Sequence, residues 1–390
     1  RREQQMIGAA GENVWVEVSR GALAHNTRSF RSILAEGVSL GAVVKANAYG
    51  HGLVEASRVF LDAGADWLCV NALYEADRLR SAGIEAPVYV MGYTSPEDAG
   101  EVIRLRCRVV VYRSDVVQAL DAAARAAGAA PVPVHIKVET GNNRQGLCPE
   151  DARKLADLIH GLPGVTLEGL TSHYADIEDT TNHGYARRQL GRFREVARDL
   201  AGSLGPIPVL HFSNSAAAML WPETHFDMIR PGISLYGMWP SKETYVSALV
   251  HGLNPLDLRP ALTWKTRIAQ IKALGTGESV GYGRSFRATH PVRLAVLPVG
   301  YYDGYDRNLG NRADVLVGGD AAPVRGRVCM NMTMVDVTHV RDAAPDQEVV
   351  LLGPGAEGAA SAERIAELSE TINYEVTTRI NERLERRLVD

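Results

Sequence analysis

The sequence predicts an α/β protein: a (β/α)8 TIM barrel followed by a mainly β domain. Two observations indicate the barrel. Short apolar runs alternate with longer amphipathic stretches between residues 39 and 233, and eight such runs within about 200 residues favour a closed barrel over a doubly wound open sheet, the alternative. A third observation, β-branched runs broken by glycine from about residue 252 onwards, indicates the second domain.

The eight barrel strands are expected where the apolar runs lie, near residues 40–45, 66–70, 87–91, 108–111, 133–138, 165–172, 207–211 and 226–229. Apolar residues at three- and four-residue spacing predict helices between them, at residues 53–63, 74–82, 115–127, 151–160 and 185–204. The second domain has strand-like runs at residues 293–299, 315–318 and 332–340, and Ser361 and Glu363 precede a final helical pattern. We therefore expect a barrel domain at residues 12–252 and a mainly β domain at residues 253–390.

The charge and composition exclude several classes of partner. The net charge of -4 comes from 42 basic and 46 acidic residues without a long run of either sign, so we expect no nucleic-acid or membrane surface. No apolar run approaches the roughly 18 residues of a membrane span. The four cysteines are scattered, which favours a reducing compartment and a cytoplasmic protein. The sequence starts at Arg1 rather than Met, so a periplasmic location is the alternative.

Polar residues at the carboxyl ends of barrel strands are the candidates for chemistry, because the loops of the active site gather on that face. Lys45 ends the first run, and Lys137 and Arg144 flank the end of the fifth. His173 follows the sixth run, and Arg230 follows the eighth. Taken singly, such residues are more often solvated charges, exposed loop residues or structural histidines.

Ser215, Gly232 and Ile233 follow the seventh and eighth strands, where such barrels usually grip a phosphate. A capping serine is the alternative reading of Ser215. Tyr282 lies in a Gly-Tyr-Gly turn of the second domain, where a packed loop tyrosine is the bland alternative. Because no His, Asp or Glu cluster has metal-ligand spacing, we expect no metal.

Seven segments together resemble the alanine racemase family, and the likeness runs from Val14 to about Tyr374. They occur in the family's order: AVVKANAYGHG at 42–52, HFSNSAA at 211–217, IRPGISLYG at 229–237, VGYG at 280–283, LPVGYYDGY at 297–305, GRVCM at 326–330 and TINYEV at 371–376. The resemblance implies a pyridoxal-phosphate-dependent amino-acid racemase that interconverts L- and D-alanine and supplies D-alanine for peptidoglycan.

The resemblance also implies roles for single residues. Lys45 would carry pyridoxal phosphate as a Schiff base, Arg144 would face its phenolic oxygen, and Arg230 would meet its pyridine nitrogen. The residues expected to bind the rest of the cofactor, chiefly its phosphate, are Tyr49, Asn214, Ser215, Gly232, Ile233 and Tyr374. Lys137 matches the family's carbamylated lysine, which would fix Arg144.

The second catalytic base matches Tyr282, contributed by the partner subunit, so the resemblance implies a head-to-tail homodimer with active sites at its interface. His173 would lie between Arg230 and this tyrosine, and Met330 would bind the substrate carboxylate through its backbone. The family's entryway residues match Tyr301, Arg307 and Arg327.

Racemisation removes a proton from one face of Cα and delivers another to the opposite face, which needs two groups on opposite sides. Lys45 and Tyr282 meet that need. A tyrosine working as a base at neutral pH needs its phenolate stabilised, and His173 and Arg230 are the expected sources. Arg230 holds its own proton too tightly to give it readily to the cofactor, which should limit transamination.

The sequence departs from the commoner family pattern at several positions, which leaves carbamylation and substrate preference open. Glu139 and Asn331 replace aspartates, Asn142-Asn143 replace Met-Gly, and Tyr74 stands where aspartate is common. A broad-specificity or serine racemase is the nearest alternative. Two alternatives are more remote. Tyr282 disfavours a pyridoxal-phosphate-dependent basic amino-acid decarboxylase, and the second domain and Tyr282 disfavour a non-catalytic pyridoxal-phosphate carrier.

Overall fold

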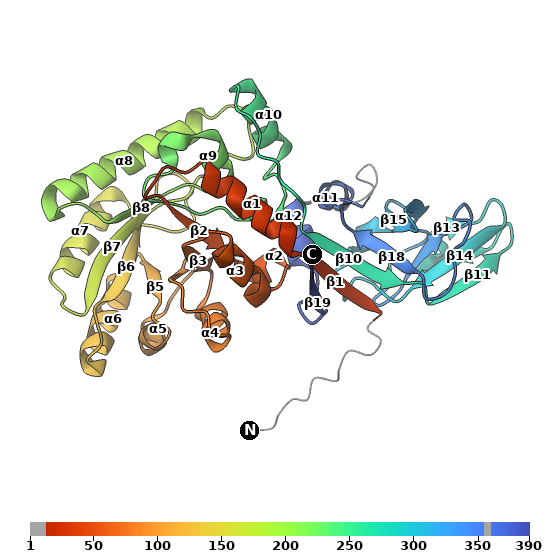
Figure 1. Cartoon of the computed structure of the whole chain (residues 1–390), viewed down its shortest axis with the longest axis horizontal. Helices are drawn as coiled ribbons and strands as arrows, with labels where there is room; N and C mark the ends of the chain where they lie inside the picture. Colours follow the sequence, from red (N-terminus) through yellow and green to blue (C-terminus); the bar gives the residue numbers. More distant parts are fainter. Residues whose placement is uncertain (1–12, 355–359) are drawn as a thin grey trace. The chain divides into compact units, whose positions relative to one another are not determined.

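The computed structural model describes residues 13–354 and 360–390, which form two compact units (Figure 1). The barrel unit contains residues 21–48 and 53–259. The β unit contains residues 13–20, 49–52 and 260–390. The expected domain boundary between residues 252 and 253 remains a prediction, and the division of the structure into units falls at 259/260.

Eight parallel strands build the barrel unit, as predicted. They are β2 (Ser39–Val43), β3 (Trp67–Val70), β4 (Val88–Val90), β5 (Arg108–Val111), β6 (Val132–Lys137), β7 (Val165–Thr171), β8 (Val209–His211) and β9 (Met228–Ile229). Their order is β8-β7-β6-β5-β4-β3-β2-β9. The two end strands approach each other, since Asp227 N–H donates to the Leu210 carbonyl at 3.1 Å and Arg230 N–H to the Ser213 carbonyl at 3.0 Å. The sheet is therefore nearly closed.

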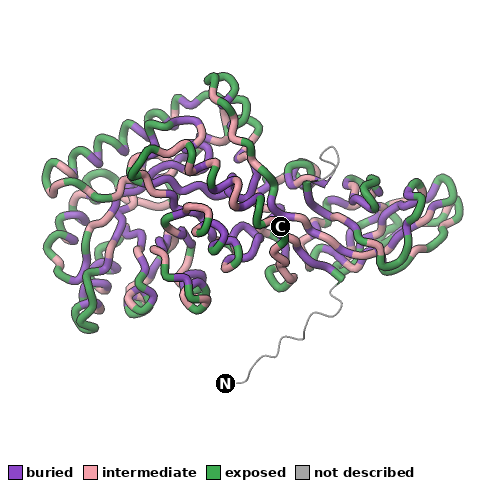
Figure 2. The backbone as a smooth tube through the Cα atoms, viewed as in Figure 1, coloured by how far each residue is buried: buried purple, intermediate pink, exposed green. Residues whose placement is uncertain are grey.

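Helices cover the outside of the barrel, and their apolar stripes account for the predicted helical pattern. They are α1 (Arg20–Ser32), α3 (Leu53–Asp62), α4 (Leu73–Ser81), α5 (Ala99–Arg104), α6 (Ser114–Ala127), α7 (Pro149–His160), α8 (Gly184–Leu204), α9 (Ser215–Leu220) and α10 (Lys242–Val250). In α8, for example, Leu190, Phe193 and Ala197 are buried at the spacing of one helix face. Figure 2 shows such buried segments alternating with exposed ones along the helices.

The β unit is mainly β, as predicted. Its sheets have the strand orders β16-β15-β18-β10-β1-β19, β11-β14-β17 and β12-β13. The strands of the large sheet are β1 (Val14–Ser19), β10 (Leu262–Arg267), β15 (Asp314–Val317), β16 (Asp320–Pro323), β18 (Glu348–Leu352) and β19 (Arg386–Val389). Those of the smaller sheets are β11 (Gln270–Leu274), β12 (Ser279–Val280), β13 (Phe286–Arg287), β14 (Val292–Leu297) and β17 (Thr333–Asp336). Two helices lie between β18 and β19 in the chain: α11 (Ala362–Ser369), capped by Ser361, and α12 (Asn373–Thr378).

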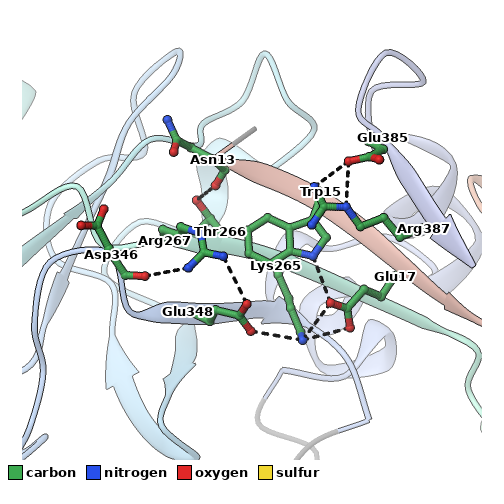
Figure 3. A network of polar contacts seen from close by, with 10 residues as sticks. All are labelled: Asn13, Trp15, Glu17, Lys265, Thr266, Arg267, Asp346, Glu348, Glu385 and Arg387. Carbon is green, nitrogen blue, oxygen red and sulfur yellow. Dashed lines mark hydrogen bonds and ion pairs between the residues drawn. The ribbon is translucent and has the colours of Figure 1, made fainter. Parts of the chain in front are cut away.

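The first strand of the chain belongs to this large sheet, although the expected barrel domain began at residue 12. β1 pairs antiparallel with β10 and parallel with β19. Its buried Trp15 ring lies between the guanidinium groups of Arg267 and Arg387, at 5.1 and 5.0 Å (Figure 3). The Lys265 ammonium is 2.9 Å from the Glu17 carboxylate. These contacts tie the N-terminal strand to segments about 250 and 370 residues later in the chain.

Candidate active site

The segment after Lys45 is a left-handed turn, which L-residues rarely form. Ala46, Asn47, Ala48 and Tyr49 have φ values of 54°, 53°, 53° and 52°. A left-handed helical conformation costs roughly 1–2 kcal/mol per L-residue, because Cβ crowds the following carbonyl oxygen. The turn therefore needs contacts that hold it in place. One of them is internal, since the Asn47 side-chain oxygen accepts the Leu53 N–H at 3.0 Å.

Glu75, on α4, provides the second support. Its carboxylate is 1% exposed and accepts the N–H groups of Ala46 and Asn71, both at 2.7 Å, and of Ala72 at 3.1 Å. Glu75 did not stand out in the sequence. A glutamate in the first turn of a helix is recognised when Ser or Thr precedes it by three positions, and here Ala72 holds that place.

The electrostatic centre of the barrel mouth is formed by two lysines, two arginines and one histidine. Burial lowers the pKa of Lys45, the charge of Arg144 lowers it further, and the Glu75 carboxylate opposes both. The pKa of Lys137 lies well below its ordinary value because of burial and then of the charges on Arg230 and Arg144.

His173 responds to the same cluster of cations. Burial first, and then the charges of Lys137, Arg230, Arg144 and Lys45, hold the pKa of His173 well below its ordinary value. The structure thus brings together the five barrel residues that the sequence singled out at strand ends. Because the cluster carries excess positive charge, it suits an anionic ligand such as a phosphate ester.

Arg230 is anchored from two sides. It is 6% exposed, its Nη2 donates to the Ser172 carbonyl at 3.0 Å, and its Nη1 donates to Nδ1 of His211. Burial lowers its pKa, and this is opposed by the neighbouring Tyr89 and Cys69 side chains. Two of its donors are therefore committed to the barrel, which sets the plane of the guanidinium.

Ser215 and Gly232 lie together, as expected for one binding loop. The Gly232 N–H donates to Ser215 Oγ at 2.9 Å, and Ile233, next in the chain, is 1% exposed. Asn214 caps α9 by accepting the Ala217 N–H at 3.0 Å. The helix cap is therefore Asn214 and not Ser215, which is the first residue of α9 and turns its Oγ to the Gly232 N–H.

Glu178 is a further acidic group at this loop, and the sequence reasoning did not identify it. Asn214 Nδ2 donates to its carboxylate, and burial raises its pKa to about 7. The adjacent Asp179 also raises this pKa, while Asn214 and Arg144 oppose the shift. No sequence signal separates Glu178 from the exposed Asp179 that follows it.

The loop between Lys137 and Arg144 is closed by Glu139, one of the departures from the family pattern. Burial would raise the pKa of Glu139, but hydrogen bonds from the backbone N–H groups of residues 141–144 more than offset this and lower it. The Tyr185 hydroxyl donates to the Gly141 carbonyl at 2.8 Å. Glutamate therefore closes the loop that carries Arg144 by accepting its backbone N–H groups.

Tyr282 lies on the surface of the β unit beside a predicted entryway residue. Its side chain is 73% exposed, within a turn whose Gly283 has a φ of +71°. A Cβ on Gly283 would lie 3.1 Å from Nη1 of Arg327. The turn therefore leaves room for the guanidinium against its backbone. Met330 and Tyr301 are also exposed, at 54% and 43%, and Arg307 begins the short helix η5 (Arg307–Leu309).

Tyr49 and Tyr374, both in the β unit, form a pair. Their ring centroids are 6.1 Å apart with an interplanar angle of 52°. Gly50, which follows Tyr49, has a φ of +86°, and a Cβ there would lie 2.1 Å from the Thr377 carbonyl oxygen. The backbone after the left-handed turn is thus packed directly on α12, which carries Tyr374.

Comparison with known proteins adds family membership to this geometry. Residues 18–240 match the model for the alanine racemase N-terminal domain, and residues 261–388 match that for the C-terminal domain. The chain belongs to the alanine racemase family. It is 38% identical to the alanine racemase of Leptospira interrogans over 96% of both chains. It is 41% identical to that of Syntrophobacter fumaroxidans, over 93% of this chain and 94% of that one.

Solved alanine racemases share the fold of this family member. The enzyme from D-cycloserine-producing Streptomyces lavendulae superposes with a TM-score of 0.89 at 34% identity, covering 98% of both chains. The Bacillus anthracis enzyme with bound L-Ala-P gives 0.89 at 30% identity, covering 98% of this chain and 96% of that one. Because the chain belongs to this family, it is an amino-acid racemase. The family is pyridoxal-phosphate-dependent.

Within residues 13–354 and 360–390, no group of three or more His, Cys, Asp or Glu side chains could hold a metal ion. No helix in the same residues combines the length and the apolar character that crossing a bilayer requires.

Proposed function

We propose that this racemase interconverts L- and D-alanine, with pyridoxal phosphate bound to Lys45 and with Tyr282 of the partner subunit as the opposing base. The observation that carries the proposal is the cationic cluster around Lys45. A lysine whose pKa is lowered by burial has more of the neutral amine needed to bind an aldehyde. The positive charge of the cluster suits the phosphate and phenolate of the cofactor.

The residues of the barrel fit this cofactor. Ser215, Gly232 and Ile233, with Tyr49 and Tyr374, would hold its phosphate. Arg144 would donate to its phenolic oxygen, and Arg230, which has donors only, would donate to its ring nitrogen. When bound, pyridoxal phosphate supplies the electron withdrawal that makes the substrate's Cα acidic.

Proton transfer falls to two side chains of the protein. Lys45 would remove or deliver the proton on one face of Cα, and Tyr282 of the partner subunit would act on the other. His173 would lie between Arg230 and that tyrosine, where its burial favours the neutral ring, able both to accept and to donate a hydrogen bond. Met330 would hold the substrate carboxylate through its backbone, and Tyr301, Arg307 and Arg327 would line the entryway.

Lys137 is the proposed carbamylated lysine. Its lowered pKa favours the neutral amine, which is the form that reacts with carbon dioxide. The carbamate would add a negative charge beside Arg144 and reduce the excess positive charge of the site. The loss of Asp and Met-Gly from this loop does not remove the support of Arg144, because Glu139 accepts the loop's N–H groups.

The proposal includes a cytoplasmic homodimer whose product, D-alanine, enters peptidoglycan. The exposed position of Tyr282 supports a role at a subunit interface. Mixing Lys45→Ala with Tyr282→Phe subunits tests this point, because a hybrid dimer has one site with both residues intact. Recovery of activity on mixing is expected; no recovery between exchanging subunits would contradict the shared site.

Two further measurements test the chemistry. Borohydride reduction of the holoenzyme should leave the cofactor covalently on Lys45, and a label on another residue would refute the assignment. In deuterium oxide, Tyr282→Phe should lose Cα exchange mainly from L-alanine, while Lys45→Ala loses both directions. Tyr302→Phe, an exposed tyrosine of the same unit, is the control.

The substrate itself is tested by screening L-amino acids for D-products and for release of carbon dioxide. Alanine should give the highest kcat/KM. A higher value for serine would favour the serine racemase alternative, and carbon dioxide from a basic amino acid would favour a decarboxylase. Such discrimination rests on about 1–3 kcal/mol of pocket contacts.

A further inference from the structure

A row of hydrogen-bonded side chains leads from Arg230 across four adjacent barrel strands. Arg230 donates to Nδ1 of His211, at the end of β8, and Nε2 of His211 lies 2.7 Å from Nδ1 of His135 on β6. Nε2 of His135 lies 2.9 Å from Glu168 on β7, which also accepts from Nε of Arg108 on β5 at 3.0 Å. Both histidines are fully buried. We call His211, His135 and Glu168 the relay.

The backbone of β6 and β7 is shaped for the relay. Their pairing register shifts between Val134, which faces Leu167, and His135, which faces Gly169. Glu168 is therefore the extra residue of a bulge, a feature that re-aims a side chain. A Cβ on Gly169 would lie 2.2 Å from Nδ1 of His135, so only glycine leaves space for the imidazole. The bulge at Glu168 and the missing side chain at Gly169 thus both make room for the buried relay.

The donors of the relay all point in one direction. Arg230 can only donate, and an ionised Glu168 can only accept, so each histidine must accept at Nδ1 and donate at Nε2. Burial lowers the pKa of both histidines, which favours their neutral form. Burial would raise the pKa of Glu168, but the hydrogen bond from His135 and then the charge and hydrogen bond of Arg108 lower it, so the carboxylate is favoured.

The relay also links Arg230 to a countercharge. Among the described residues, no carboxylate forms an ion pair with Arg230, and the side chains that offset its burial are Tyr89 and Cys69. The Tyr89 ring packs against both histidines, at centroid distances of 4.7 and 5.2 Å. The path from Arg230 to a negative charge is therefore the aligned dipoles of two neutral imidazoles ending at Glu168.

We propose that Glu168 is a positioning residue of the racemase: it fixes the tautomers of His135 and His211 and so holds Arg230 oriented for the cofactor ring. The action on the cofactor rests on the proposed function. The tautomers themselves depend only on the protein and not on the cofactor.

Replacing Glu168 by glutamine would remove the charge at the end of the relay but keep its acceptor. His135 Nε2 and Arg108 Nε both donate to Oε2 of Glu168, so the amide oxygen takes this place and the NH2 group takes that of Oε1. The tautomers then stay, because Nε2 of His135 still meets an acceptor. The aligned dipoles no longer end at a negative charge, so they hold Arg230 less firmly.

The test is nitrogen NMR of the holoenzyme with 15N-labelled histidine rings. In the wild type, both histidines should show a bare Nδ1 and a protonated Nε2, and a proton on Nδ1 of either would overturn the proposal. In Glu168→Gln, the tautomers should stay and the absorption band of the cofactor should change its pH dependence. kcat/KM should fall about 10- to 100-fold, the loss typical of groups that support a catalytic ligand.

Two further variants separate positioning from stability. Asp121→Asn makes the same change at a carboxylate that binds the Gly164 N–H, outside the relay, and should leave the tautomers, the band and kcat/KM unaltered. Glu168→Asp keeps the carboxylate and should restore the wild-type band and keep the wild-type tautomers. Equal effects of Glu168→Gln and Asp121→Asn, or reversed tautomers in Glu168→Asp, would overturn the proposal. If the wild type has these tautomers but no racemase activity, the proposed function fails and the relay stands.

Discussion

Replacing Glu75 by glutamine should loosen the turn that follows Lys45. The two oxygens of this buried carboxylate accept three partly buried N–H groups, one from Ala46 and two from Asn71 and Ala72. An amide keeps one oxygen and puts an NH2 group in place of the other. At least one N–H then loses its acceptor and faces another donor, whichever way the amide turns.

The cost follows from this count. A buried donor left without an acceptor costs about 1–3 kcal/mol, and the remaining bonds lose the strength that a charged acceptor adds. We expect the free energy of unfolding to fall by about 2–4 kcal/mol. The four left-handed residues cost roughly 4–8 kcal/mol, so the turn should relax once Ala46 is released and Lys45 should lose its position.

Urea unfolding measures the first effect, and the fraction of Lys45 labelled by cofactor and borohydride measures the second. Glu55→Gln is the control, because Glu55 is an exposed acid in the first turn of the next helix, α3. The reasoning is refuted if Glu75→Gln unfolds within about 0.5 kcal/mol of Glu55→Gln and labels Lys45 equally.

Two more predictions concern packing and charge. Gly169→Ala should destabilise the barrel by at least about 2 kcal/mol, since its Cβ would overlap His135. Gly191→Ala, in open space on α8, should stabilise it by about 0.5–1 kcal/mol. Calorimetry measures the thermal stability of the two variants. Lys265→Met should cost about 1 kcal/mol, because it removes the partner of Glu17. Burial would raise the pKa of Glu17, but the Trp15 indole N–H and Lys265 more than offset this, so the pKa is lowered. The stability from this shift is present above the pKa of free glutamate, about 4.3, and is lost as pH falls below it.

Lys272→Met, at an exposed position of β11, is the control for the charge prediction. The difference between the Lys265 and Lys272 variants in urea should be largest near neutral pH and should shrink in acid. A difference that is constant down to the acid limit of folding would mean that the Glu17 pair contributes nothing.

The architecture of both units could be read from the sequence. Strands buried on both faces must be almost wholly apolar, so the eight apolar runs predicted β2 to β9. Apolar residues at three- and four-residue spacing predicted helices such as α8. The strand that pairs with β1 could not be predicted from the sequence, because the alternation of apolar and polar residues in β1 suits any half-buried strand. Its place beside β10 depends on a pairing across nearly the whole chain.

The candidate site was predicted in part. Lys45, His173 and Arg230 stood out because they end barrel strands, whereas Glu75, Glu168 and Glu178 did not stand out. An acidic residue on a helix, an outer strand position or a loop is normally solvated, and nothing in its neighbours along the chain shows that it is covered. The bulge on β7 is what turns Glu168 toward His135.

The sequence by itself determined the element pattern, the kinds of side chain available and the family, because these depend on residues in order along the chain. Only the tertiary structure decided the conformation after Lys45, since Ala46 and Ala48 belong to the residue type with the highest preference for a right-handed helix. It also decided the pKa directions of Lys45 and Lys137 and the tautomers that Glu168 imposes. Each of these depends on burial and on charges brought close by strands that are far apart in sequence.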